Sequence, residues 1–304
     1  MFLILSRGPA QTHNAPPQPR GRLVDVGGYR VHVYCAGDGS PTVLITGAGY
    51  SFDWGLVQPE VAKFTRVCAY DHSGIAWSDP GPTDTCSLRV REIHSAMRNA
   101  QIPGPYVLVG HSLDALVSRL YTSKYSDDVA GMVIVDHALQ FSGPHLIPAS
   151  PRVSRPPNPS ETIGTPNVEP LPAALPVPVA PRAVADLSFQ KLSPRHYQLH
   201  LWANSLPGYS RVMDRNRAMV SECASEVEAE SRNQTSPLKD KPLIVLSTSA
   251  RYSLHSTFLS LSLNSKLVVA ENSGHAIMID RPDVVVDAIR EVVEAAQNYS
   301  KLKN

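Results

Sequence analysis

A strand, a sharp turn and a helix follow one another between Pro105 and Tyr121, and this unit constrains the fold more than any other stretch. Tyr106–Val109 is a short apolar run rich in β-branched residues, which is typical of a strand buried on both faces. Apolar residues then recur at helical spacing, so only Gly110–Asp114 remains for the connection. Such a turn strains its central residue, Ser112, and projects that side chain outward at a helix N-terminus, where developing negative charge is favoured. Ser112 is therefore a candidate nucleophile.

The hexapeptide Gly-His-Ser-Leu-Asp-Ala at residues 110–115 resembles the nucleophile elbow of α/β-hydrolases, in particular the Gly-His-Ser-Leu-Gly-Gly of bacterial serine esterases. Three further segments resemble parts of the same family: Val67–Pro80, Tyr125–Asp136 and Asn272–His275. Together the similar regions cover most of the chain. The family resemblance implies an α/β-hydrolase fold and a serine hydrolase acting on carboxylic esters.

That resemblance also implies the roles of two residues, with Ser112 forming an acyl-enzyme and His275 acting as general base. Serine at neutral pH is a weak nucleophile until an imidazole takes its proton. His275 follows Gly274 in a predicted turn between the last strand and the closing helix. The alternative is a catalytically impaired binding protein with the same fold, since a fold does not fix a function. Amide hydrolysis or perhydrolysis on the same elbow is a third hypothesis.

The imidazole of such a pair needs a carboxylate to fix its tautomer. In the resembling family this acid most often follows the strand that here spans Lys241–Ser247, yet no Asp or Glu occurs from there to Ala270. Glu271 adjoins the histidine loop but would have to reach back along the same short segment. Asp136, at the end of the strand after the elbow helix, is the better candidate, because dehalogenases and lipases of similar fold take their acid there. A structural role for Asp136 is the alternative.

The Gly-rich exit Gly47–Tyr50 lets a backbone N–H approach a substrate carbonyl. By resemblance, this loop supplies one oxyanion-hole donor, from Ala48 or Gly49, and the N–H of Leu113 supplies the other. Asp114 replaces the glycine that the resembling esterases carry. The negative charge of an aspartate in the first helical turn would slow catalysis about tenfold, because the same helix end must stabilise the oxyanion, so Asp114→Gly is expected to raise kcat. The alternative is that Asp114 points into water and has no effect.

The order of the predicted elements indicates an α/β fold with a doubly wound, mostly parallel sheet and its active site at the carboxyl ends of the strands. A hairpin is expected at Gly27-Gly28. The remaining elements are expected as strands at Thr42–Thr46, Phe64–Tyr70, Lys241–Ser247 and Ser265–Ala270, and helices at Thr85–Asn99 and Pro282–Gln297.

The domain organisation follows from composition. Residues 1–21 are predicted to be disordered, and residues 22–138 and 239–304 to form the hydrolase core. Residues 139–238 are interpreted as an inserted cap or lid, Pro-rich over 142–181 and helical afterwards. A structureless linker is the alternative for the Pro-rich half.

Composition limits the partners. The formal net charge of +1 indicates no nucleic acid, so a small-molecule ester is the expected partner. No metal-ligand spacing occurs, and no cofactor is expected. The four cysteines are interpreted as free thiols, with Cys35 and Cys68 in buried strands. The four apolar residues Phe2–Leu5 are too few for a signal peptide or a membrane span, so no stable membrane insertion and a cytoplasmic location are expected.

Overall fold

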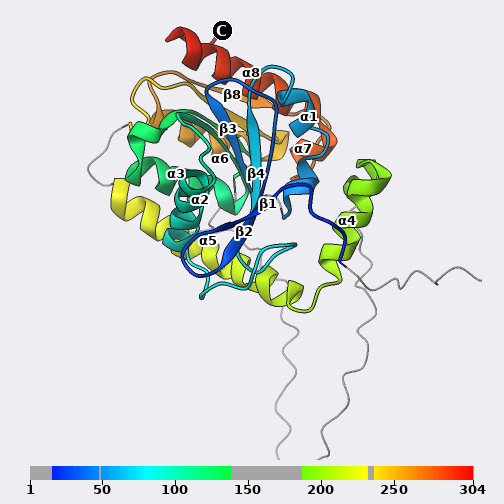
Figure 1. Ribbon diagram of the computed structural model, residues 1–304. Helices are drawn as coiled ribbons and strands as arrows, with labels where there is room; N and C mark the ends of the chain where they lie inside the picture. Colours follow the sequence, from blue (N-terminus) through cyan, green and yellow to red (C-terminus); the bar gives the residue numbers. More distant parts are fainter. Residues whose placement is uncertain (1–15, 48, 138–186, 232–235, 304) are drawn as a thin grey trace, which may run out of the picture. The chain divides into compact units, whose positions relative to one another are not determined.

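The computed structural model describes residues 16–47, 49–137, 187–231 and 236–303. Its central feature is an eight-stranded sheet in the order β1-β2-β4-β3-β5-β6-β7-β8 (Figure 1). Strand β2 runs antiparallel to β1 and β4, and all pairings from β4 through β3 to β8 are parallel. The strands are β1 (Arg22–Asp25), β2 (Arg30–Ala36), β3 (Thr42–Thr46), β4 (Val67–Asp71), β5 (Tyr106–His111), β6 (Val129–Val135), β7 (Leu243–Ser247) and β8 (Ser265–Val269).

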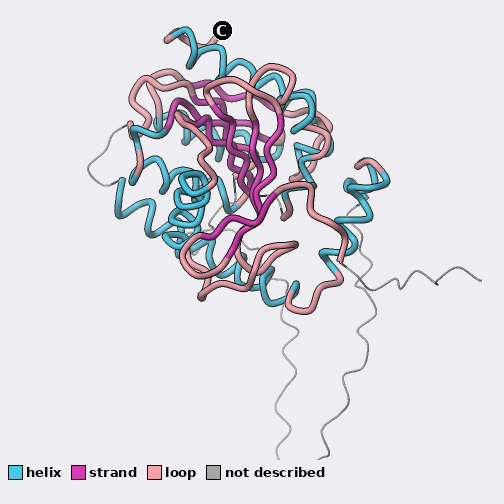
Figure 2. Tube along the Cα trace, viewed as in Figure 1, coloured by secondary structure: helices cyan, strands magenta, loops and turns pink. Residues whose placement is uncertain are grey.

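Helices connect the strands from β3 onward along the chain, and Figure 2 shows the strands in magenta with helices in cyan around them. The α-helices are α1 (Gln58–Val61), α2 (Cys86–Asn99), α3 (Leu113–Lys124), α4 (Pro194–Asn204), α5 (Tyr209–Ser231), α6 (Tyr252–His255), α7 (Ile277–Asp280) and α8 (Pro282–Asn298). The short 3-10 helices are η1 (Ser51–Trp54), η2 (Ser126–Asp128), η3 (Leu187–Lys191), η4 (Ser249–Arg251) and η5 (Ser256–Leu261).

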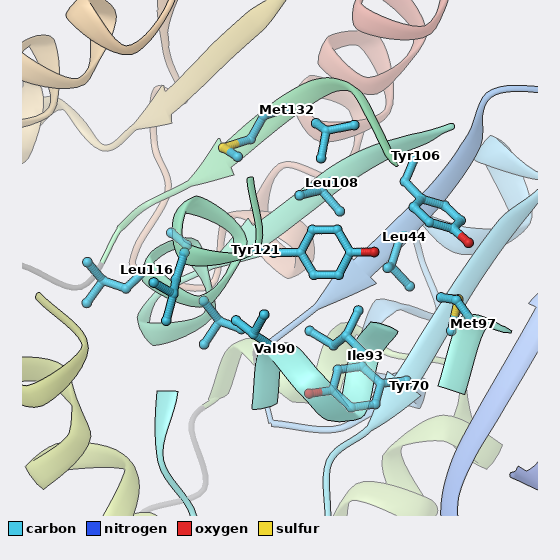
Figure 3. Close-up of a cluster of buried hydrophobic side chains, with 14 of the residues drawn as sticks. Leu44, Tyr70, Val90, Ile93, Met97, Tyr106, Leu108, Leu116, Tyr121 and Met132 are labelled. Carbon is cyan, nitrogen blue, oxygen red and sulfur yellow. The ribbon is translucent and has the colours of Figure 1, made fainter. Parts of the chain in front are cut away.

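Alternate residues of the parallel strands face two separate hydrophobic clusters, as the period of two in a strand requires. On one face Leu44 and Leu108 pack with residues of α2, α3 and α5, and Figure 3 shows Leu44 and Leu108 in this cluster with Val90, Leu116 and Tyr121. On the other face Val43 and Val107 pack with α1, α7 and α8. Because both faces are covered, the central strands read as continuous apolar runs. The doubly wound, mostly parallel fold expected from the sequence is therefore confirmed.

Most expected elements lie within a few residues of their predicted positions. The hairpin turns at Gly27-Gly28, and both glycines have positive φ, 117° and 98°. Helix α2 begins after Thr85, whose side-chain oxygen accepts the N–H of Leu88 at 3.1 Å as an N-cap. The segment 1–15 and the Pro-rich stretch 142–181 lie outside the described residues, so their predicted disorder and lid role stay predictions.

Helix α5 lies within the predicted 139–238 insertion, yet it packs against the same face of the sheet as α2 and α3. Its Met219, Cys223 and Val227, spaced four residues apart, are buried in the cluster with those two helices. In addition, the Nε of Arg215 donates to the carbonyl oxygen of Asp84 at 2.7 Å. This part of the predicted insertion therefore contributes to the core.

The interpretation of the cysteines as free thiols is wrong, because all four form disulfides, Cys35–Cys68 and Cys86–Cys223. Cys35 and Cys68 are direct partners in the antiparallel register of β2 and β4, with Cα atoms 4.0 Å apart. The second bond joins the first turn of α2 to the middle of α5. Both disulfides form because distant elements become neighbours in the fold. The spacing of the cysteines in the sequence does not show this. The cytoplasmic location expected from the sequence stays a prediction.

We expect the double variant Cys86→Ala, Cys223→Ala to lower the free energy of unfolding by roughly 2–5 kcal/mol, because the bond closes a long loop between α2 and α5. Urea denaturation of the oxidised proteins measures the difference. The single variant Cys86→Ala is the control and should lose the same amount. Equal stability of the variant and the wild type would contradict the bond's stabilising role.

Candidate active site

Ser112 lies at the tip of the turn between β5 and α3. Its backbone has φ 55° and ψ −122°, a region that a residue with a side chain enters at a cost of roughly 1–3 kcal/mol. The turn is so tight that a Cβ added at Gly110 would lie only 2.7 Å from the carbonyl oxygen of Asp114 and 2.8 Å from the Cα of Ala115. Glycine at position 110 therefore lets α3 start immediately after the strand.

His275 faces Ser112 from the loop between β8 and α7. Its Nε2 lies 3.0 Å from Ser112 Oγ, and the His275 side chain is 43% exposed. The Nε2 of His111, at the end of β5, donates to the His275 carbonyl oxygen at 2.9 Å. Burial lowers the pKa of His111 to about 3, so its ring is neutral and serves as a fixed donor. The loop is thus attached to the same strand end that carries the serine.

Asp136 completes the group, because β5 and β6 are parallel neighbours and end at the same edge of the sheet. Its Oδ2 accepts the Nδ1–H of His275 at 2.5 Å, and its side chain is fully buried. The Asp136 backbone has φ 38°, a second strained position at this edge. Glu271, the carboxylate next to the histidine loop, accepts instead from Ser249 Oγ at 2.9 Å. The structure brings Ser112, His275 and Asp136 together, and their catalytic roles remain a prediction.

The charge of Asp136 is compensated inside the protein. Burial alone would raise the pKa of this carboxyl group, but the hydrogen bond from His275 and the charge of Arg251 help to outweigh it and lower the pKa. Asp136 is therefore ionised at neutral pH. An ionised carboxylate on Nδ1 places the other ring nitrogen, Nε2, as acceptor toward the serine hydroxyl.

Two basic residues at this site, Arg251 and His255, were not predicted from the sequence. Arg251 Nη1 lies 2.8 Å from Asp136 Oδ2, and His255 Nδ1 lies 3.7 Å from Asp136 Oδ1. Both belong to the segment after β7, where the family usually carries its acid. The sequence carried a signal for these two residues, because the segment after β7 lacks carboxylates but contains an arginine and a histidine.

The oxyanion-hole residues are placed in part. Leu113 is the first residue of α3, so its N–H has no acceptor within the helix. Gly49 has φ 84°, while the N–H of Tyr50 is taken by Asp53 Oδ2 at 3.2 Å. Ala48, the other candidate, lies outside the described residues. The donor roles of Leu113 and Gly49 stay predictions.

The alternative that Asp114 points into water is wrong, whereas the expected effect of its charge on kcat stays a prediction. The residue is 6% exposed, and its Oδ2 lies 3.3 Å from Nη1 of the fully buried Arg89. Arg89 also pairs with Asp84 and contacts Asn216 of α5. Burial raises the pKa of Asp114, and the nearby Arg89 charge partly offsets this effect. Glycine at position 47 makes room, since a Cβ there would lie 2.7 Å from the Asp114 Cβ.

We therefore expect that Asp114→Asn does not raise kcat, even at low salt. The variant should lower the free energy of unfolding by about 3 kcal/mol, because Arg89 loses a buried partner. Asp214→Asn is the matched control, because Asp214 pairs with Arg217 on the exposed side of α5 and should contribute under about 1 kcal/mol. Urea denaturation measures both. Equal losses in the two variants would contradict the importance of the buried pair.

The described residues contain no group of three or more His, Cys, Asp or Glu side chains that could hold a metal ion. Within the same part of the chain, no helix combines the length and the apolar character that a membrane crossing needs.

Curated relatives with sequence similarity are mostly uncharacterised. The protein YqjL of Bacillus subtilis is 25% identical over 271 residues, which cover 84% of this chain and 85% of YqjL. An uncharacterised protein of Schizosaccharomyces pombe is 34% identical over 89 residues, which are 29% of this chain and only 16% of that protein. A 2-hydroxy-6-oxo-6-(2'-aminophenyl)hexa-2,4-dienoic acid hydrolase of Metapseudomonas resinovorans is 28% identical over 122 residues, 38% of this chain and 42% of the relative.

Solved structures share the fold. A putative epoxide hydrolase mutant from Pseudomonas aeruginosa superposes with a TM-score of 0.67 at 17% identity, covering 91% of this chain and 96% of that one. A meta-cleavage product hydrolase mutant from Pseudomonas fluorescens gives 0.61 at 17% identity, covering 89% and 98%. A family profile described as "Alpha/beta hydrolase family" matches residues 42–288. This chain belongs to the alpha/beta hydrolase family.

Proposed function

We propose that this alpha/beta hydrolase is a serine hydrolase that cleaves carboxylic esters through an acyl-enzyme at Ser112. The observation that carries the proposal is the chain of contacts from Ser112 Oγ to His275 Nε2 at 3.0 Å, and from His275 Nδ1 to Asp136 Oδ2 at 2.5 Å. A hydroxyl, a neutral imidazole and a buried carboxylate in this order are what nucleophilic acyl transfer requires.

The reaction begins when Ser112 Oγ attacks the ester carbonyl carbon and His275 Nε2 takes the hydroxyl proton. The resulting oxyanion is stabilised by the N–H group of Leu113 and by that of Ala48 or Gly49, with the N-terminus of α3 adding a favourable dipole. The imidazolium then gives its proton to the leaving alcohol, and a water molecule repeats the sequence to release the acid. Asp136 keeps its charge throughout and stabilises the imidazolium while it exists.

Hydrolysis of a carbon–carbon bond beside a ketone is a second candidate. It is favoured by the similarity to the Metapseudomonas resinovorans hydrolase and to the meta-cleavage product hydrolase structure. Serine attack on a ketone carbonyl gives the same kind of acyl-enzyme when the adjacent carbon–carbon bond breaks and the leaving carbon takes the proton that His275 received from Ser112. Comparing turnover of a short p-nitrophenyl ester with that of a meta-cleavage dienoic acid separates the two candidates.

We expect Ser112→Ala to reduce hydrolysis of p-nitrophenyl acetate to within about 10³–10⁴-fold of the uncatalysed rate, because the covalent step is lost. Ser221→Ala, a change at an exposed position of α5, is the control and should keep wild-type kcat. Labelling by a fluorophosphonate probe should disappear only in the Ser112 variant. Undiminished turnover by Ser112→Ala would place the chemistry elsewhere, and an inert wild type would favour a binding protein.

We expect Asp136→Asn to lower kcat by about 10⁴-fold, because the amide cannot hold the His275 tautomer or stabilise the imidazolium. Asp287→Asn, at an exposed position of α8, should leave kcat unchanged. Steady-state kinetics on proteins whose folding is checked by circular dichroism measures both. A normal kcat in Asp136→Asn would show that this carboxylate is structural and that Ser112 and His275 act as a dyad.

A further inference from the structure

Arg251 reaches the candidate acid from a neighbouring strand. Strands β6 and β7 are parallel, with Val135 opposite Leu246, and the N–H of Asp136 donates to the Leu246 carbonyl oxygen at 3.0 Å. The loops that leave these two strands are therefore adjacent. Arg251 is the last residue of η4, which begins two residues after β7 ends. Its guanidinium group lies beside the carboxylate for this topological reason.

Two donors share one oxygen of the carboxylate. Asp136 Oδ2 is 2.5 Å from His275 Nδ1 and 2.8 Å from Arg251 Nη1, and these two nitrogen atoms are 3.4 Å apart. The arginine is always charged at physiological pH. When the imidazole is also protonated, two positive groups face one negative charge at this short separation. Protonation of the imidazole would therefore place a second positive charge next to the guanidinium group.

We propose that Arg251 is a positioning residue of this active site, which fixes the Asp136 carboxylate and keeps resting His275 in the neutral form that can accept the serine proton. The inference rests on the proposed function. A histidine beside a lone buried carboxylate would be protonated more readily, and a protonated ring cannot act as base. Arg251 reduces that tendency while leaving the carboxylate available to orient the ring.

The other groups around the pair do not provide this charge. Burial lowers the pKa of both His111 and His255, so these rings are neutral near pH 7. His255 Nδ1 also lies 2.8 Å from Ser247 Oγ, which gives that ring nitrogen a neutral partner. Glu271 is held by Ser249 Oγ, at the start of η4. Among the described residues, Arg251 is thus the arginine or lysine whose charged group lies within 4 Å of the Asp136 carboxylate.

The test follows protonation of His275 directly, by a proton NMR titration in which the ring signal is assigned through its loss in His275→Gln. Arg251→Met should move the midpoint of this titration to higher pH by about one unit. The shift is kept moderate because the Arg251 side chain is 37% exposed and its charge is screened. Arg251→Lys should retain a midpoint close to that of the wild type. Arg217→Met, which removes an exposed charge from α5, is the matched control and should change nothing.

Kinetics provides a second measurement on the same proteins. The acidic limb of the kcat/KM profile for p-nitrophenyl acetate should move with the NMR midpoint, with KM unchanged. An unmoved midpoint in folded Arg251→Met would overturn the inference. So would a rise in KM confined to anionic esters, because Arg251 would then bind substrate instead. If the midpoint moves but wild-type protein hydrolyses no ester, the inference stands and the proposed ester hydrolysis fails.

Discussion

The buried carboxylate of Asp136 is the group on which the arrangement of the candidate site depends. A fully buried negative charge is stable only when donors and cations compensate it. Here the compensation comes from His275 and Arg251, which reach one carboxylate oxygen from two different loops. The parallel register of β5, β6 and β7 brings these loops and the Ser112 turn to one edge of the sheet. The sheet topology and the ion pairs of Asp136 therefore hold the candidate site at the same edge of the sheet.

Other buried carboxylates hold the surroundings of this edge. Asp71, at the end of β4, accepts from His32 Nδ1 and from the N–H of Ser51, each at 2.7 Å, and so fixes the chain just after the Gly-rich loop. Asp114, in the first turn of α3, is paired with Arg89 of α2. Both backbone segments expected to donate to the oxyanion are thus connected to buried polar partners. Rigid donors of this kind stabilise a developing charge without reorganisation.

Patterns within short stretches of the sequence predicted the site residues whose positions depend on a single turn. The positions of Ser112 and His275 follow from a strand-to-helix turn and a Gly-His turn. Asp136 was expected from the resemblance to hydrolases that take their acid from the end of the strand after the elbow helix, since no carboxylate occurs between β7 and Ala270. What the sequence did not reveal depends on contacts between distant elements. Arg251 meets Asp136 across 115 residues, and the disulfide partners Cys86 and Cys223 are separated by 137. The pairing of Asp114 with Arg89 likewise depends on how two helices pack.

The candidate site depends most directly on the hydrogen bond in which Asp136 accepts the Nδ1 proton of His275. A proton in such a short charge-assisted hydrogen bond gives a strongly downfield resonance, which can be observed by proton NMR on protein labelled with ¹⁵N-histidine. We expect one downfield signal coupled to Nδ1 of His275, lost in Asp136→Asn and retained in Glu271→Gln. A signal that survives Asp136→Asn, or that disappears in Glu271→Gln, would contradict it and assign the acid elsewhere.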